Sequence, residues 1–321
     1  MTAKVEKRIG TDRTPLQDVI PLNTPYLVFL DPSDACNAHC AWCPSGQADV
    51  LAAVGRKPQL MRWDVYCRIL TSLLDMPNRI KTLRLYKDGE PLLNPAFPDM
   101  VRLAKDCGKF GAVDTTTNGT LLSPEMNDQI VYSGLDKIFI SVPMTYNQHY
   151  INKVADLFTK KKHLHIHCKM VLPQYYPATI DKLFKEHFQE ICDTISLEYV
   201  SPCWPGVRET PPSIGIYGQA IPENPPEVCP YVFYSMAINS DGTVSRCFLD
   251  WKHDSIVGDL KTEHARDVWT GENMRWIRFS HLRKQKKFMY DCRDCKQLVY
   301  GAADNIDRYA QTLSEMNYGK L

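Results

Sequence analysis

Three cysteines, Cys36, Cys40 and Cys43, lie within eight residues in the stretch DPSDACNAHCAWCPSG. A structural zinc site normally takes four protein ligands, so three thiols alone leave a metal site open. A cubane iron–sulfur cluster held by three cysteines likewise leaves one iron free for a ligand from outside the protein. The C-x3-C-x2-C spacing therefore predicts an open metal centre.

Four further cysteines follow a second pattern, C-x17-C, then 44 intervening residues, then C-x2-C: Cys229, Cys247, Cys292 and Cys295. Four thiolates can close a zinc site or hold an iron–sulfur cluster with complete protein ligation, and the spacing alone does not choose between them. The chain has twelve cysteines and shows no export signal. We therefore expect reduced thiols in a cytoplasmic protein rather than disulfides.

The first cysteine group must be positioned by the strand before it, and that strand opens a repeated pattern. Short β-rich runs occur at 26–31, 80–86, 111–117, 137–142, 164–172 and 193–200. Helical periodicity separates them at 61–76, 96–108, 123–134, 148–162 and 179–191. This alternation predicts an α/β fold with a parallel sheet. At about 30 residues per βα unit, six units fit and eight do not, which predicts a partial (βα)6 TIM-like barrel.

The pattern changes after the last strand. Residues 201–228 are rich in proline and glycine, which indicates a linker. Beyond them, NSDG separates two β-rich runs and predicts a hairpin, followed by a helix around 265–287. The predicted parts are an N-terminal extension, the partial barrel, the linker and a small C-terminal domain, at 1–25, 26–200, 201–228 and 229–321.

Composition argues against two kinds of partner. The formal net charge is +1, so there is no electrostatic reason to expect nucleic acid or an anionic membrane surface. No segment reaches the roughly 18 consecutive apolar residues of a membrane span. A small-molecule substrate is therefore favoured.

Side-chain alternation sorts the two faces of each strand. In HLHIHCKMVL, Cys168 shares one face with apolar residues, whereas Lys169 shares the other with histidines. The apolar face should pack on the helices, so Lys169, and Glu198 on the next strand, are predicted to face the barrel lumen. Both lie late on their strands, close to the expected reaction site. They could bind substrate, move a proton, or form a salt bridge with each other.

These features resemble the radical S-adenosylmethionine (SAM) superfamily. The resemblance rests on the three-cysteine spacing after the first barrel strand, on Trp42 before the third cysteine, and on the turn Gly89-Glu90-Pro91 after the second strand. It implies a [4Fe-4S] cluster on Cys36, Cys40 and Cys43, whose open iron is chelated by the amino and carboxylate groups of SAM. One electron, from a donor such as flavodoxin or ferredoxin, would then release a 5′-deoxyadenosyl radical.

The resemblance also implies which residues contact SAM. Trp42 would lie beside the adenine through its backbone, and the turn Gly89-Glu90-Pro91 would contact the amino group. Asn118 and Ser141 sit where the family commonly contacts the methionyl or ribose groups, although a purely structural hydrogen bond is an equal alternative. The sequence has Asp88 where the common motif has its first glycine, giving KDGEP.

The C-terminal residues resemble the SPASM/twitch domains that carry auxiliary iron–sulfur clusters. The similar segments are CPYVFYSMAINSDGTVSRC, IVGDL, VWTG and CRDC, and no cysteine follows Cys295. That absence makes the chain similar to the shorter, one-cluster twitch form, as in the 2-deoxy-scyllo-inosamine dehydrogenase type. The resemblance implies an auxiliary [4Fe-4S] cluster bound by Cys229, Cys247, Cys292 and Cys295.

The leading hypothesis is the dehydrogenation of an alcohol carbon on a sugar, aminocyclitol or similar metabolite, with the auxiliary cluster as electron acceptor. Arg246 and Asp250, beside one auxiliary cysteine, could hold or deprotonate substrate, or could be ordinary neighbours of the cluster. The main alternative is an epimerase in which Cys203 returns a hydrogen atom. Peptide side-chain modification and a non-enzymatic metal-binding protein are the remaining alternatives.

Overall fold

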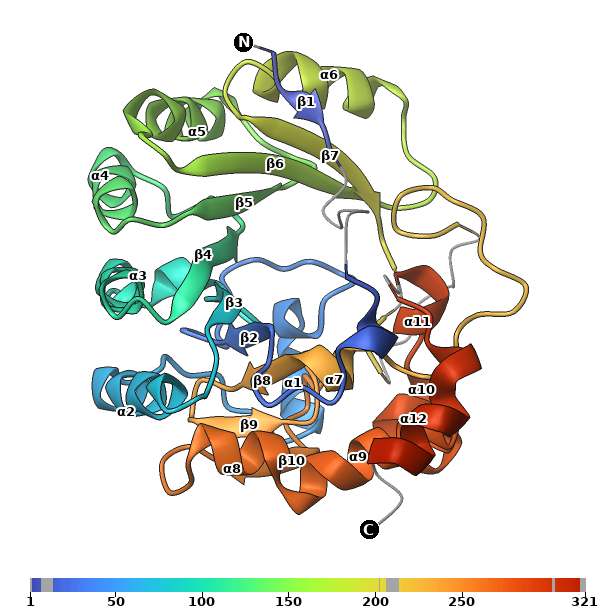
Figure 1. Cartoon of the computed structure of the whole chain (residues 1–321). Coiled ribbons are helices and arrows are strands. Elements are labelled where there is room, and N and C mark those ends of the chain that lie inside the picture. The colour runs from blue at the N-terminus through green and yellow to red at the C-terminus, as the bar shows by residue number, and fades with distance from the viewer. Residues whose placement is uncertain (1, 7–13, 202, 206–213, 302–303, 318–321) are drawn as a thin grey trace.

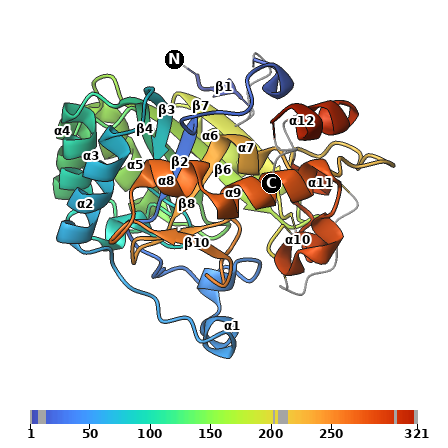
Figure 2. The same cartoon turned by 60° about the horizontal axis from the view of Figure 1, so that its bottom comes forward.

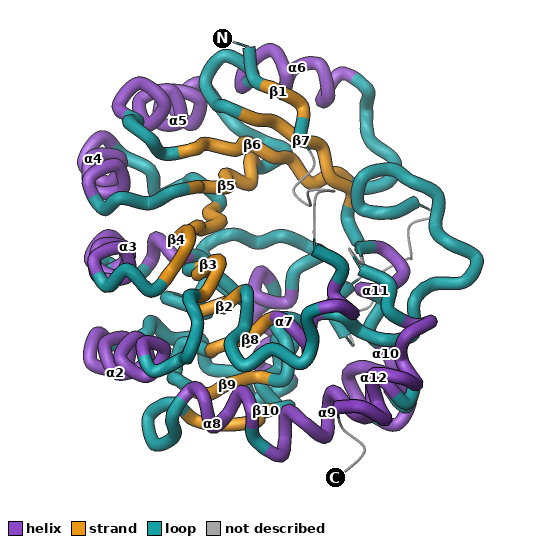
Figure 3. The backbone as a smooth tube through the Cα atoms, in the orientation of Figure 1, coloured by secondary structure: helices purple, strands orange, loops and turns teal. Residues whose placement is uncertain are grey.

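The computed structural model describes residues 2–6, 14–201, 203–205, 214–301 and 304–317. Its strands form one ten-stranded sheet in the order β1-β7-β6-β5-β4-β3-β2-β8-β9-β10 (Figures 1 and 3). The strands are β1 (Lys4–Val5), β2 (Leu27–Leu30), β3 (Ile80–Arg84), β4 (Phe110–Thr117), β5 (Lys137–Val142), β6 (His165–Leu172), β7 (Thr194–Tyr199), β8 (Ser235–Ile238), β9 (Thr243–Ser245) and β10 (Ile256–Asp259).

The helices that alternate with the parallel strands lie on the outer side of the sheet (Figure 1). Helices α8 and α9 lie beside β9 and β10, and α10 to α12 lie together to the right in this view. Helix α1 lies in the excursion between β2 and α2 and projects away from the sheet (Figure 2). The α-helices are α1 (Ala48–Ala53), α2 (Trp63–Leu74), α3 (Phe97–Asp106), α4 (Pro124–Tyr132), α5 (Gln148–Lys160), α6 (Thr179–Phe188), α7 (Tyr231–Tyr234), α8 (Ala265–Thr270), α9 (Glu272–Leu282), α10 (Tyr290–Asp294), α11 (Gln297–Tyr300) and α12 (Ala310–Asn317). Short 3-10 turns are η1 (Leu16–Asp18), η2 (Pro44–Gly46), η3 (Pro91–Leu93), η4 (Lys286–Phe288) and η5 (Asp307–Tyr309).

The predicted partial barrel is confirmed. Strands β2 to β7 are parallel neighbours in chain order, and helices α2 to α6 connect them. Side-chain caps mark the first residues of two of these helices. The Ser123 hydroxyl accepts the Met126 N–H at the start of α4, and Asn147 accepts the Tyr150 N–H at the start of α5.

The alternation predicted for β6 is also observed. Cys168 is fully buried among the apolar side chains under the helices. On the other face, Lys169 pairs with Glu198 of the adjacent strand β7. His167 lies on this face too, and its ring nitrogens are hydrogen-bonded to the hydroxyls of Thr194 and Ser196 at 2.7 and 2.9 Å. This histidine is therefore satisfied within the sheet.

The sheet continues beyond the predicted barrel at both edges. Strand β8 pairs parallel with β2, and the predicted hairpin, β8 with β9, thus extends the barrel sheet. The hairpin turn needs Gly242, whose φ is +89°. At the other edge, β1 from the N-terminal segment pairs with β7. The hairpin strands were predicted from the sequence without their partner in the barrel, and β1 was not predicted, since residues 1–25 were expected only to be an extension.

One expected helix is two helices. The stretch 265–287 was expected to be continuous, but α8 ends at Thr270 and α9 begins at Glu272. Gly271 between them has an extended backbone, with φ −71° and ψ 171°, which interrupts helical hydrogen bonding. None of the described helices has the length and apolar character to cross a membrane.

Candidate iron–sulfur and SAM sites

The first cysteine loop leaves the end of β2 and folds tightly on itself. The Cys43 N–H donates to the Cys40 carbonyl, and the Gly46 N–H donates to the Cys43 carbonyl, each at 3.1 Å. A Cβ at Gly46 would lie 2.7 Å from the Cys40 nitrogen, so only glycine fits this approach. The Ala38 N–H points at the Cys36 sulfur at 3.4 Å. These contacts bring the three thiols into one small region.

The thiols of this loop influence one another electrostatically. Burial raises the pKa of all three, and that of Cys43 rises to about 12, with further contributions from Cys40 and Cys36. Neutral thiols are therefore favoured unless a cation is present to stabilise thiolates. The donor set fits a soft, positively charged metal group.

The KDGEP turn is pressed against this loop. A Cβ at Gly89 would collide with the carbonyl oxygens of Ser33 and Ala35, which requires glycine at that position. The Glu90 N–H donates to the same Ala35 carbonyl at 2.8 Å. The turn and the loop therefore pack as one unit just before Cys36.

The Glu90 carboxylate connects the turn to the end of β4. It accepts hydrogen bonds from the Leu92 N–H at 3.1 Å, the Thr117 hydroxyl at 2.6 Å and the Asn118 N–H at 2.7 Å. The Asn118 amide in turn donates to the Asn37 side chain, which lies in the cysteine loop, at 2.8 Å. The carboxylate thus positions the surrounding backbone, so any contact with an amino group would come in addition to this role.

Two further predicted SAM contacts lie at this end of the barrel. Trp42 is half-buried in the cysteine loop, and Ser141 is half-buried on β5, in register with Lys169 of β6. The assignment of Trp42, Ser141 and the KDGEP turn to SAM stays a prediction.

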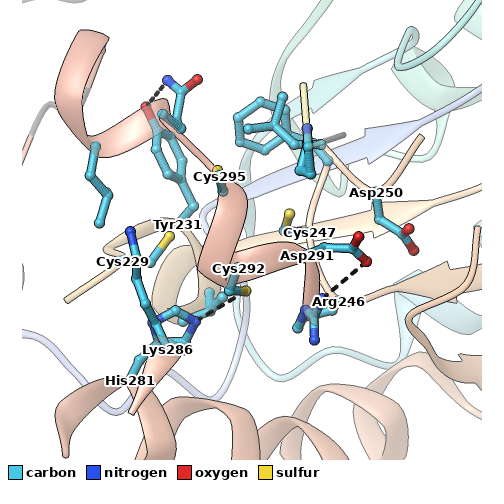
Figure 4. A pocket seen from close by; sticks show the side chains of 16 residues that line it. Cys229, Tyr231, Arg246, Cys247, Asp250, His281, Lys286, Asp291, Cys292 and Cys295 are labelled. Carbon is cyan, nitrogen blue, oxygen red and sulfur yellow. Dashed lines mark hydrogen bonds and ion pairs between the residues drawn. The ribbon is translucent and has the colours of Figure 1, made fainter. Parts of the chain in front are cut away.

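The four C-terminal cysteines come together although they lie on separate elements. Cys229 precedes α7, Cys247 follows β9, Cys292 is in α10 and Cys295 directly follows that helix. All four line one cavity of about 40 Å³, and Figure 4 shows their sulfur atoms around it. One water needs about 10–15 Å³, so the cavity has room for a larger group.

Burial also governs the chemistry of this second set. It raises the pKa of Cys229 well above its usual value, that of Cys247 to about 12 and those of Cys292 and Cys295 to about 11. The mutual repulsion of their charged forms adds to the shift. Four thiols of half-buried cysteines around one space fit a bound metal group that would stabilise thiolates.

Basic groups adjoin these thiols (Figure 4). Burial alone would lower the pKa of the Arg246 guanidinium. The negative charges of the neighbouring Cys292, Cys247 and Asp291 outweigh this effect of burial and raise the pKa. Lys286 lines the same cavity. His281 is buried with Nε2 3.7 Å from the Cys292 sulfur, and burial lowers its pKa to about 3, so it is a neutral imidazole. The two cations suit an anionic iron–thiolate group, and sequence reasoning missed both Lys286 and His281.

Three of the predicted catalytic residues lie beside this second set. The Asp250 carboxylate accepts the N–H groups of Asp254 and Ser255 at 3.4 and 3.2 Å, so it holds its own loop. Arg246 donates to the Ser255 hydroxyl at 2.8 Å and lies 3.5 Å from Asp291. The Cys203 carbonyl lies 3.9 Å from the Cys295 sulfur, which places this cysteine near the auxiliary set. The catalytic roles of Arg246, Asp250 and Cys203 stay predictions.

The other two predicted catalytic residues face each other in the lumen. Lys169 Nζ lies 3.0 Å from Glu198 Oε2, and both side chains are nearly inaccessible to solvent. The salt bridge given as the alternative is therefore present, and a contact of the pair with substrate stays a prediction.

The fold and the two cysteine sets together define an iron–sulfur enzyme built on a partial α/β barrel. The family model for the radical SAM superfamily matches residues 30–195, more than half of the chain, and the chain belongs to that superfamily. A second model, the SPASM iron–sulfur cluster-binding domain, matches 229–296, which includes all four C-terminal cysteines. The cofactors of the protein are SAM, a [4Fe-4S] cluster and an auxiliary iron–sulfur cluster. Enzymes of this superfamily act on small molecules or peptides and require a reductant.

The similar curated proteins have different activities. A GTP 3′,8-cyclase of Chlorobaculum tepidum is 32% identical over 112 residues, which are 34% of this chain and 30% of that protein. A tungsten-containing aldehyde ferredoxin oxidoreductase cofactor-modifying protein of Pyrococcus furiosus is 30% identical over 115 residues, 36% of this chain and 30% of that protein. The chain thus spans about a third of the length of these curated relatives.

Solved structures resemble the chain over most of its length. BtrN in complex with AdoMet and 2-DOIA has a TM-score of 0.60 at 13% identity, covering 88% of this chain and 97% of BtrN. Native anSMEcpe with bound AdoMet has a TM-score of 0.59 at 15% identity, covering 90% and 95%. At such low identity these likenesses show the fold alone.

Proposed function

We propose that this enzyme dehydrogenates an alcohol carbon of a sugar, aminocyclitol or similar hydroxylated metabolite. The observation that carries the proposal is the convergence of Cys229, Cys247, Cys292 and Cys295 on one cavity. Four protein thiols give complete ligation, which leaves no iron site for substrate and suits a centre that only accepts an electron. The fold shared over 88% of the chain with BtrN, solved in complex with AdoMet and 2-DOIA, is consistent with this proposal.

The reaction balances without an external oxidant. When bound, SAM and the first cluster would supply the 5′-deoxyadenosyl radical that removes the carbinol hydrogen atom, and the auxiliary cluster would accept the second electron. The hydroxyl proton leaves as the C=O bond forms, and SAM becomes methionine and 5′-deoxyadenosine. The electron spent on SAM cleavage is matched by the electron recovered from substrate, so the overall reaction consumes none. A carrier such as flavodoxin or ferredoxin would reduce the first cluster and take the electron from the auxiliary cluster.

The residues of this chain would divide the binding roles by position. Cys36, Cys40 and Cys43 would hold the first cluster because their loop leaves one iron position open. The loop, the KDGEP turn and the ends of β4 and β5 would bind SAM. The proposed SAM contacts are Trp42, Gly89, Glu90, Pro91, Asn118 and Ser141.

The proton would leave through the lumen pair. Lys169 and Glu198 are held 3.0 Å apart on the lumen face of the sheet. Such a pair can orient a hydroxyl through the ammonium and accept its proton on the carboxylate. Arg246 and Asp250 are already engaged within their own loop, so we assign them the positioning of that loop.

The test uses anaerobically reconstituted enzyme, SAM, a reductant and a panel of aminocyclitols and amino sugars deuterated at single carbinol carbons. We expect deuterium in 5′-deoxyadenosine and a ketone at the labelled carbon for one class of substrate. A Cys295→Ala variant, with only three thiols at the auxiliary site, is expected to yield much less ketone. The control is Cys67→Ala, at a cysteine outside both sets.

Three outcomes would overturn the proposal. The first is ketone formation with unlabelled 5′-deoxyadenosine. The second is an epimer that carries solvent deuterium in D2O and disappears in Cys203→Ala, which would indicate epimerisation. The third is a covalently modified peptide as the product.

A further inference from the structure

A buried cluster of charged side chains lies between the KDGEP turn and the C-terminal residues. The side chains of Lys87 and Asp88 are fully buried. One oxygen of the Asp88 carboxylate, Oδ2, faces three nitrogen atoms. It lies 2.5 Å from Lys87 Nζ, 2.8 Å from His253 Nε2 and 3.8 Å from an Arg56 nitrogen. We refer to Arg56, Lys87, Asp88 and His253 as the bridging cluster.

On its C-terminal side, the bridging cluster holds the segment that follows the auxiliary cysteine Cys247. Lys87 Nζ donates to the Asp250 carbonyl at 3.1 Å, and the Arg56 guanidinium donates to the Trp251 carbonyl. His253 comes from this same segment, and its φ of +56° is a conformation that L side chains rarely adopt. The hydrogen bond between His253 and Asp88 helps to hold this uncommon backbone conformation.

On its N-terminal side, the bridging cluster holds the approach to the first cysteine loop. Arg56 also pairs with Asp34, two residues before Cys36, at 2.6 Å. The Asp88 N–H donates to the Asp31 carboxylate at 3.1 Å. The Arg56 side chain therefore contacts residues next to both cysteine sets, and Asp88 links them as well, through its N–H on one side and its carboxylate on the other.

The charges of this region are consistent with an ionised Asp88. Burial raises its pKa, but Lys87, His253 and Arg56 outweigh burial and bring the pKa to about 2. Burial and the neighbouring Asp88 raise the pKa of Asp31 well above its usual value. Because the Asp88 carboxylate is an acceptor, the Nε2 of His253 must carry the proton of their hydrogen bond.

We propose that Asp88 is a positioning residue that fastens the KDGEP turn to the segment after Cys247, so that SAM binding depends on His253 of the C-terminal region. A glycine at this position could not make these contacts. The inference rests on the proposed role of the KDGEP turn in SAM binding. It goes further, because it makes SAM affinity depend on the contact between Asp88 and His253, which joins the turn to the C-terminal region.

The test measures SAM binding to full-length, cluster-loaded protein by equilibrium dialysis, together with the electron paramagnetic resonance spectrum of the reduced first cluster with and without SAM. We expect His253→Ala and Asp88→Asn each to weaken SAM binding at least tenfold and to reduce the spectral change on adding SAM. His253→Gln keeps an amide donor and should lie nearer the wild type than His253→Ala. Iron content should stay at the wild-type value in the His253 variants.

The matched control is Asp99→Asn, since Asp99 also pairs with a cation, but on the exposed surface of α3. It should leave SAM affinity unchanged. If Asp88→Asn does not fold, the two His253 variants decide the question, because both keep the buried Lys87–Asp88 pair. SAM affinity and spectra within twofold of wild type in His253→Ala would overturn the inference. A wild type whose spectrum ignores SAM would instead contradict the proposed site itself.

Discussion

The lumen pair Lys169–Glu198 allows structural and catalytic roles to be separated. The two side chains are 9% and 3% exposed and lie 3.0 Å apart. Lys169→Met leaves the Glu198 carboxylate buried without its cation, which costs about 3–5 kcal/mol for a buried pair. At about 2–4 °C per kcal/mol for proteins of a few hundred residues, the melting temperature should fall by at least about 6 °C.

The double variant Lys169→Met/Glu198→Leu removes both charges. Replacing a whole buried pair by apolar groups is often close to neutral, so we expect this variant to recover most of the lost stability. If the pair also handles the substrate proton, the double variant should still cleave SAM but form little ketone. The melting temperature and the ratio of ketone to 5′-deoxyadenosine are measured on the same anaerobic samples.

Two results would refute this reasoning. A loss below about 1 kcal/mol in Lys169→Met would mean that the pair is solvated, as surface pairs of that strength are. Recovery of both stability and ketone formation in the double variant would mean that the pair is structural and takes no part in the reaction. The single variant Glu198→Gln, which keeps the shape of the side chain, serves as the control for packing.

Three further predictions concern the two sites. Glu90→Gln replaces the oxygen that accepts the Asn118 N–H by an NH2 group, so it should destabilise the protein by about 1–3 kcal/mol in urea unfolding and weaken SAM binding; unchanged binding would exclude Asn118 from the SAM site. The pKa of Asp88 is lowered from 3.8 to about 2, so the ionised carboxylate contributes about 2 kcal/mol to the free energy of unfolding above pH 3.8 and loses this contribution as the pH falls toward 2. Metal-free wild type should lose this stability between pH 5 and 2, whereas Asp88→Asn should not. The double variant Cys292→Ala/Cys295→Ala, which leaves two thiols at the auxiliary site, should lower the iron content from about eight to about four per chain if both clusters are cubanes; eight retained irons would remove these two cysteines from the auxiliary site.

Local pattern was sufficient to predict much of the barrel. Strand β5 was predicted with its observed bounds, and the other barrel strands and helices within three residues, because alternation and helical period are local properties. The grouping of the cysteines also followed from spacing. Their three-dimensional convergence, with Cys229 far from Cys292 along the chain, could be inferred only from the family resemblance.

The bridging cluster could not be predicted from local pattern. His253 is 165 residues from Asp88, and Lys87 next to it gave no periodic signal. The one available signal was Asp88 itself, a charged residue in a turn where the resembling family has glycine. Partners of buried charges are set by tertiary packing, and neither propensity nor spacing encodes them. The pairing of β8 with β2 escaped prediction for the same reason.

The pairing of β8 with β2 has a consequence for attempts to divide the chain. A polypeptide ending before Cys229 would retain all the barrel strands but would expose the full edge of β2, the strand that leads into the first cysteine loop. Exposed edge strands recruit other chains through their free N–H and C=O groups. Such a fragment would therefore self-associate at the edge nearest its own cofactor. The C-terminal residues act as the cover of that edge as well as the carrier of the second cysteine set.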